Sequence, residues 1–409
     1  MAQEYYSEAE WNGFQSLFPN SGNRTGVMKL AGPDPRYNCI AWALGRTELW
    51  IDPPAEPAYF RALFLSPLFK LKECQADQAL VDGFYKDDTG VCTHGSRLVQ
   101  GNRWTSKLGQ GFLISHPREA LNDYSKQHRS LYGDNVFHFC PDPNAMDIVS
   151  MPSPPLALQQ SQFLLLLTFM ASIQMAFPRY WQHFDANWKS WALVYRQPGG
   201  ITASSSSDFA RGPAWDALIS MGTRILPLVV EKIVKESELF ACQLYNALQT
   251  APDKKLSPQN NEHFYILNWQ IVWIANLYRS QFDEFEKAAQ AWRVDQQVAM
   301  YSSTAVSYVS GKNYQALVNM GKAIIPFIMG RYCQDQHGWW YELLNEIMTG
   351  AKYGLAIINK EALYQAWANW FEYGGDEPPR IESSASGAMF ACVIQAGAHR
   401  QKVRIPLAT

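Results

Sequence analysis

The feature that most constrains the fold is a self-similarity in the second half of the chain. The segment Trp215–Gly222 returns as Tyr314–Gly321, with apolar and small residues at the same places and an offset of 99 residues. Such a long period, with apolar residues at helical spacing, is typical of two copies of one helical unit packed on each other. We therefore predict an all-α domain of two tandem repeats, at about 160–255 and 256–352.

Both copies contain a proline inside an apolar stretch, Pro227 in the first and Pro326 in the second. Proline removes a helical hydrogen bond and clashes with the preceding turn, so a kinked helix is expected at both places.

The remaining sequence suggests how the chain is divided. We expect a first domain at 1–145 and a proline-rich linker at 146–160. The helical domain then occupies 161–375, and a C-terminal tail follows at 376–409, beginning with an exposed loop.

Composition excludes several classes of protein. The chain has 409 residues and a net charge of −2, without runs of Lys or Arg, so neither nucleic acid nor a membrane surface is an expected partner. The strongest apolar run, Phe163–Phe177, is shorter than the roughly 20 residues of a membrane-spanning helix. The N-terminus has no signal-peptide pattern, and the seven cysteines have no paired spacing. Together these features predict a cytoplasmic protein with reduced thiols.

The stretch Asn38–Gly45 (Asn-Cys-Ile-Ala-Trp-Ala-Leu-Gly) predicts a short buried helix. Asn38 is a good N-cap and Gly45 a good stop. Cys39 then lies in the first turn, where free amide protons and the helix dipole favour a thiolate. This is a suitable place for a thiol nucleophile, although a buried structural cysteine has the same pattern.

A run of strand-like segments separated by turns follows. Ala79–Tyr85, Val91–Val99 and Arg103–Gly109 predict an antiparallel meander, with 132–139 as a fourth strand. A helix carrying Cys, followed by such a meander carrying His, is the chain order of papain-like folds of the compact NlpC amidase type. The predicted fold class is therefore α+β, with an N-terminal papain-like domain followed by the helical one.

Three residues of the meander region are candidates for a site with Cys39. His94 follows a turn and has small neighbours, so it is the candidate base, although a hydrogen-bonded half-buried histidine is equally in keeping with its place. His116 could orient the His94 ring or cap the next segment. Cys92 lies two residues before His94 and is expected on the same face of the strand.

A longer pattern adds a resemblance. Tyr37–Gly45, Thr93–Gly109 and Ile114–His116 resemble a family of small domains with the pattern Y-N-C-I-A-x-A-x-G, H-x-x-R-x-x-x-G-x-W-x-S-K-L-G and I-x-H. The resemblance covers roughly residues 5–140. It implies that Cys39, His94, Ser106 to Gly109 and His116 belong to one site, and it implies no particular reaction.

We infer from these residues a cysteine-dependent acyl-transfer enzyme, either an amidase or peptidase or a transferase or cyclase. Cys39 would attack a carbonyl, His94 would carry the proton, and His116 would hold the imidazole. Backbone amides at the helix start, with Asn38 or Ser106, would stabilise the oxyanion. Further candidates for contact with the substrate are Lys107, Trp42 and Trp104.

The expected substrate is a small molecule or a peptide, with neither a metal nor another cofactor. Two alternatives remain. The chain could be a non-catalytic binding protein that docks a protein partner through its helical repeats, or a biosynthetic enzyme whose site lies in the helical domain.

Overall fold

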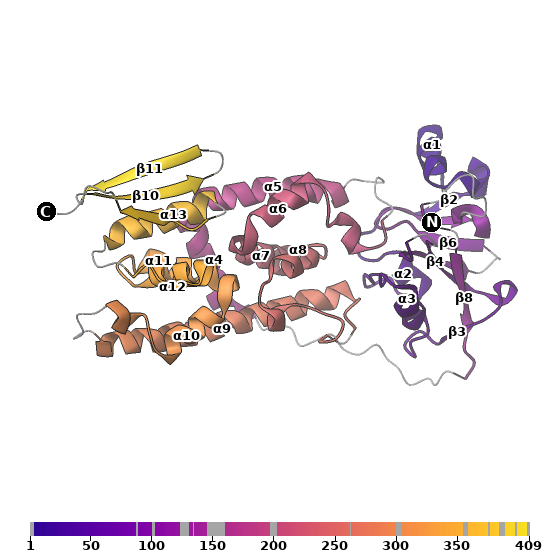
Figure 1. The fold of residues 1–409 in the computed structure, drawn as a ribbon. Coiled ribbons are helices and arrows are strands. Elements are labelled where there is room, and N and C mark those ends of the chain that lie inside the picture. Colours follow the sequence, from indigo (N-terminus) through magenta and orange to yellow (C-terminus); the bar gives the residue numbers. More distant parts are fainter. Residues whose placement is uncertain are drawn as a thin grey trace. The chain divides into compact units, whose positions relative to one another are not determined.

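The computed structural model describes residues 4–86, 89–99, 103–122, 131–133, 135–144, 160–196, 203–261, 263–299, 305–354, 359–374, 377–383, 389–396 and 399–406. Apart from its last residue, the predicted linker at 146–160 lies outside these ranges. The chain forms two compact units (Figure 1). Unit 1 comprises Met1–Pro155, Ala192–Arg211 and Ser257–Gln270, and unit 2 comprises Leu156–Trp191, Gly212–Leu256 and Ile271–Thr409.

Unit 1 contains an antiparallel sheet of eight strands, in the order β1-β2-β7-β6-β5-β4-β8-β3. The strands are β1 (Glu4–Tyr5), β2 (Met28–Ala31), β3 (Leu71–Glu73), β4 (Val81–Tyr85), β5 (Cys92–Val99), β6 (Arg103–Lys107), β7 (Leu113–His116) and β8 (Asn135–Pro141). The predicted meander is confirmed as β4, β5 and β6, and helices follow the sheet in the chain, so the fold is α+β.

The α-helices of unit 1 are α1 (Glu8–Leu17), α2 (Cys39–Ala43) and α3 (Pro57–Phe64). Ser7 and Glu10 form a capping box that fixes the start of α1. Helix α3 ends at Phe64, earlier than the apolar periodicity of residues 58–72 suggests, and Leu71–Glu73 is strand β3. Pro67 accounts for the early end, because proline cannot continue a helix.

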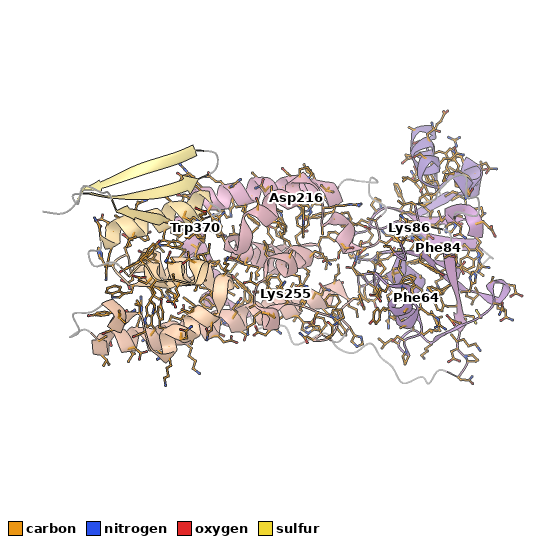
Figure 2. The ribbon with its side chains drawn as sticks, viewed as in Figure 1. Phe64, Phe84, Lys86, Asp216, Lys255 and Trp370 are labelled. Carbon is orange, nitrogen blue, oxygen red and sulfur yellow. The ribbon has the colours of Figure 1, made fainter. Side chains whose placement is uncertain are left out.

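The sheet has a hydrophobic cluster on each face. On one face α2 and α3 pack with Val81, and on the other the aromatic side of α1 packs with Phe84. Phe64 belongs to the first cluster and Phe84 to the second (Figure 2). Successive side chains on a strand point to opposite faces of the sheet. A residue of β4 or β5 that packs in one of the two clusters therefore points to the face that carries that cluster.

Unit 2 is mainly helical. Its helices are α4 (Gln160–Ala176), α5 (Pro178–Arg196, whose last residues belong to unit 1), α6 (Pro213–Ser220), α7 (Leu226–Glu236), α8 (Ala241–Leu248), α9 (Leu267–Val298, which begins in unit 1), α10 (Lys312–Asn319), α11 (Ile325–Gln334), α12 (Trp340–Thr349) and α13 (Lys360–Tyr373). Within the described ranges no single helix is long and apolar enough to cross a membrane; α4 and α5 pass that test only as a pair, and they are bent by 103°.

The kinked helices predicted at Pro227 and Pro326 are not observed. Each proline lies in the first turn of its helix, α7 or α11, directly after a 3-10 turn (η6, Gly222–Ile225, and η10, Gly321–Ile324). No helical hydrogen bond is required of the backbone nitrogen at that place, so proline starts a new helix there and does not bend an existing one.

Part of the predicted C-terminal loop and tail is a sheet. Strands β9 (Arg380–Ser383), β10 (Met389–Ala396) and β11 (His399–Pro406) pair antiparallel in the order β11-β10-β9, drawn in yellow beside α13 in Figure 1.

Candidate functional site

Cys39 is the first residue of α2, and Asn38 caps that helix as predicted. The Asn38 Oδ1 accepts a hydrogen bond from the Ala41 amide at 3.1 Å. Its Nδ2 donates to the carbonyl oxygens of Ile51 and Ser204, both at 2.7 Å. One fully buried side-chain amide therefore starts the helix and holds two other segments of unit 1 against it.

The Cys39 thiol is completely buried, and its Sγ donates to the Ser204 hydroxyl oxygen at 2.9 Å. Burial raises the pKa of Cys39 to about 11, although the Ser204 hydroxyl, the backbone N–H groups of Gly95 and Ile40 and the charge of Lys107 all act to lower it. Desolvation therefore outweighs the helix-start effect, and the thiol is protonated at neutral pH in this conformation.

The structure does not bring His94 to Cys39. Gly95 of β5 faces α2, because a Cβ there would lie 2.8 Å from the Ala43 Cβ and 3.3 Å from the Cys39 carbonyl oxygen. Its neighbour His94 faces the other side of the sheet and stacks on Tyr132, with ring centroids 3.8 Å apart. Neither ring nitrogen of His94 has a hydrogen-bond partner among the described residues, and burial holds its pKa well below the usual value.

A β-bulge explains why the predicted geometry differs from the observed one. Phe84 pairs with His94, but Tyr85 pairs with Cys92, so the register shifts at Thr93. The extra residue reverses the alternation of side chains along β5. Cys92 consequently packs in the cluster that holds Cys39, while His94 lies on the opposite face, so the expectation that Cys92 and His94 share a face is wrong.

His116 contacts Ser106 on the same face as His94. The His116 Nε2 lies 2.8 Å from the Ser106 Oγ, and its Nδ1 lies 2.7 Å from the Pro117 carbonyl oxygen. Because a carbonyl only accepts, Nδ1 carries the proton and Nε2 accepts from the serine hydroxyl. Burial lowers the pKa of His116 to about 4, so the ring is neutral. This is a hydroxyl paired with a base, but neither residue lines the pocket described below.

The predicted site residues thus divide between the two faces of the sheet. Trp42 lies on the α2 face, where its Nε1 donates to the Thr105 Oγ at 3.1 Å. Trp104 lies on the His94 face and packs under the Arg118 guanidinium. The α2 face carries Asn38, Cys39, Trp42 and Lys107, and the opposite face carries His94, Trp104, Ser106 and His116.

Lys107 is a titratable group on the α2 face, where Cys39 also lies. It is fully buried, and its Nζ donates to the carbonyl oxygens of Gly109 and Gly111, both at 2.8 Å. Burial lowers the pKa of Lys107 to about 8, against the opposing effects of Asp34 and Cys39. A neutral amine has two N–H groups for these two carbonyls and keeps its lone pair, so Lys107 can accept a proton here.

Three site residues were missed by sequence reasoning, namely Ser204, Ser206 and Asp52. We call residues 203–209 the serine segment. In it, the Ser206 amide donates to the Asp52 Oδ1 at 2.9 Å, and the Ser206 hydroxyl donates to the other carboxylate oxygen. The Trp50 Nε1 also donates to Asp52, at 2.9 Å. Burial raises the pKa of Asp52 to about 6. The run of four consecutive serines was the available signal, although such a run is also typical of a loop before a helix.

A pocket of about 560 Å³ lies on the outer side of the serine segment. Ser204 lines this pocket, whereas Cys39, hydrogen-bonded behind Ser204, does not. Lys86 (labelled in Figure 2), Arg211 and Asp208 also line it and supply two positive charges and one carboxyl group. Burial raises the pKa of Asp208, while Arg211 and Lys86 act to lower it. The pocket is therefore suited to a polar or anionic ligand.

Within the part of the chain that the structure describes, no group of three or more His, Cys, Asp or Glu side chains could hold a metal ion. Residues 29–140 match the model of a family described as a domain of unknown function (DUF7689). No curated protein and no solved structure is significantly similar to the chain.

Proposed function

We propose that the protein is a cysteine-dependent acyl-transfer enzyme and that Cys39 is its nucleophile. The observation that carries this proposal is the environment of the sulfur. The sulfur lies at the start of a helix and accepts hydrogen bonds from two backbone N–H groups. Only the small side chain of Ser204 separates it from a pocket. Donors in this arrangement stabilise a thiolate, and later an oxyanion, once the desolvating serine segment is displaced.

Lys107, and not His94, is the residue that exchanges the proton in this proposal. Cys39 and Lys107 interact electrostatically, and the pKa of about 8 allows the lysine to be neutral in a useful fraction of molecules near neutral pH. Proton transfer from the thiol to the amine would give a thiolate beside an ammonium ion, and each charge would stabilise the other.

The test uses p-nitrophenyl acetate, an activated ester small enough to reach a confined thiol. The parent chain should release a burst of nitrophenol and carry one acetyl group on Cys39, located by mass spectrometry. The burst should be absent from Cys39→Ser and unchanged in Cys92→Ser, which removes another buried thiol of the same hydrophobic cluster.

Lys107→Arg keeps donors for the two carbonyls but cannot take up a proton, so it should slow the burst about 100-fold, the usual contribution of a general base. An unchanged burst in Cys39→Ser would refute the proposal, and an unchanged burst in Lys107→Arg would refute the role of the lysine.

One observation favours a different function. Burial and a raised pKa are also the properties of a structural cysteine, as in the non-catalytic binding protein considered above. In that case the pocket would bind its ligand without covalent chemistry, and Cys39→Ser would leave binding intact.

The finer description of the fold is also a proposal. A cysteine at the start of a helix packed on an antiparallel sheet supports a papain-like unit 1, with the orientation of His94 as a departure from it. The elements α6-η6-α7-α8 and α10-η10-α11-α12 follow the same order, and the Thr223 hydroxyl of η6 donates to the Lys322 carbonyl of η10 at 3.0 Å. These facts support two tandem repeats that pack through equivalent turns.

The cellular setting completes the proposal. The described cysteines are free, which supports a reducing compartment such as the cytoplasm.

A further inference from the structure

We infer that the acyl donor is an extended polypeptide, and that the serine segment occupies the site as a built-in copy of it. This inference rests on the proposed function and names its substrate class. It starts from the way in which the two anchoring side chains, Asn38 and Asp52, bind the segment.

Both anchors bind groups that any extended peptide offers. Asn38 donates its Nδ2 to the backbone carbonyl of Ser204, beside the Cys39 sulfur. Two residues later, Asp52 accepts the backbone N–H of Ser206. The intervening residue, Ser205, is extended, with φ −102° and ψ 139°. A carbonyl and an amide at this separation are recognised without reference to sequence, and both anchors are buried, so their loss would leave unpaired polar groups.

The site also selects a side chain at one position of the bound peptide, the position that Ser206 occupies in the serine segment. The Ser206 hydroxyl also donates to Asp52, so the site favours a hydroxyl-bearing residue two places after the carbonyl that Asn38 holds. The residue at that carbonyl is expected to be small, because Ser204 is buried and contacts both Cys39 and Asn38. The substrate class is therefore a peptide with a small residue followed, two places later, by serine or threonine.

The reaction that follows is an ordinary transacylation. The Cys39 sulfur bonds to the carbonyl carbon held by Asn38, and the C–N bond to the next residue breaks. The thiol proton, carried by Lys107, leaves with the released amine. Water then cleaves the thioester, which gives a carboxylic acid and restores the thiol. In the resting chain the Cys39 S–H donates to the Ser204 hydroxyl. The sulfur is therefore hydrogen-bonded to the side chain of Ser204 and does not attack its carbonyl carbon. The serine segment thus acts as an inhibitor that is part of the chain.

The experiment measures access to Cys39 in the full chain by its rate of alkylation with iodoacetamide. Ser206→Ala removes one hydrogen bond to a carboxylate and should speed labelling by about 10-fold or more. Ser207→Ala is the matched control. Its side chain is exposed and bonds only Ser205 in the segment, so labelling should not change.

The peptide acetyl-Ala-Ser-Ser-Ser-Ser-Asp-Phe-amide, which copies residues 203–209, is then added to the Ser206→Ala chain. It should restore protection of Cys39, and the same peptide with alanine in place of its third serine should protect about 10-fold less well. Equal protection by both peptides, or by neither, overturns the inference, as does unchanged labelling in Ser206→Ala. If Ser206→Ala fails to fold, Ser204→Ala, which removes only the hydroxyl that accepts from the Cys39 sulfur, takes its place.

The outcome can be separated from that of the proposed function. Protection by the peptide requires recognition and no chemistry, whereas the nitrophenol burst requires chemistry and no peptide. A burst without peptide protection would leave the acyl-transfer proposal standing and refute the inference about the substrate. Protection without a burst would refute the acyl-transfer proposal and leave only the recognition of an extended peptide.

Discussion

Asp52 allows the energetic cost of the serine-segment anchor to be measured. Its carboxyl is buried and accepts hydrogen bonds from Trp50 and Ser206, but no cation among the described residues forms an ion pair with it. The neighbouring carboxyl of Asp208 raises its pKa further. A pKa of about 6 in place of the ordinary 3.9 corresponds to about 3 kcal/mol, because one pKa unit is ~1.4 kcal/mol.

The sign follows from linkage. The folded chain binds this proton more tightly than the unfolded chain does, so the folded state is favoured as the pH falls from 6 towards 4. Above pH 6 the ionised carboxylate is buried in full, and unit 1 is less stable by about 3 kcal/mol than it would be with a neutral group there. An asparagine is such a group, because its Oδ1 can accept from Trp50 and Ser206 and its Nδ2 can donate to the Ser206 hydroxyl.

We therefore expect Asp52→Asn to gain stability relative to the parent as the pH rises, by about 2 kcal/mol between pH 4 and pH 7, because an unfolded carboxyl is already half ionised at pH 4. The assay is urea unfolding at several pH values, with pulse alkylation of Cys92 as a readout of unit 1. Asp77→Asn, which makes the same substitution at an exposed carboxyl, is the matched control. A difference that does not vary with pH, or that favours the parent at high pH, would refute the reasoning.

Three further predictions concern other parts of the chain. In the parent at neutral pH, Cys39 should be alkylated about 300-fold more slowly than a free cysteine of pKa 8.5, with a midpoint near pH 11; a midpoint below 8.5 would contradict the burial described here. His94→Phe keeps the stack on Tyr132 and removes two buried nitrogens that have no hydrogen-bond partner among the described residues. Urea titration should therefore show no loss of stability and a gain of up to about 2 kcal/mol, with Cys39 labelling unchanged. Gly330→Ala would place a Cβ in steric clash with the Phe169 ring and should destabilise unit 2 by about 1–3 kcal/mol in thermal melting. A melting temperature equal to that of the parent would show that α4 and α11 pack less closely than described.

Local signals predicted the elements of unit 1 well. Asn38 caps its helix, and β4, β5 and β6 begin or end within about two residues of the expected positions, because capping and turn preferences act over a few neighbouring residues. Strands β4, β5 and β6 could therefore be predicted from the sequence. Strand β9 could not, because the segment around it has the proline and serine content of a loop.

The site was predicted less well than the fold, for two physical reasons. A single extra residue at Thr93 turns His94 to the far face, and no residue type marks a β-bulge of this kind. Ser204 reaches Cys39 across a separation of 165 residues, and such a contact depends on tertiary packing that local patterns do not encode. Asp52 and Lys107 have perturbed pKa values because they are buried. From residue type alone, both are expected on the surface of the protein.

The position of Ser204 in the chain has a consequence for biosynthesis. A ribosome that adds ~5–20 residues per second needs roughly 10–30 s to pass from Cys39 to Ser204, since 165 residues separate them. During that interval the nascent chain carries α2 without the segment that covers its thiol. Protection of the Cys39 thiol is therefore a property of the finished chain and is acquired only after Ser204 has been made.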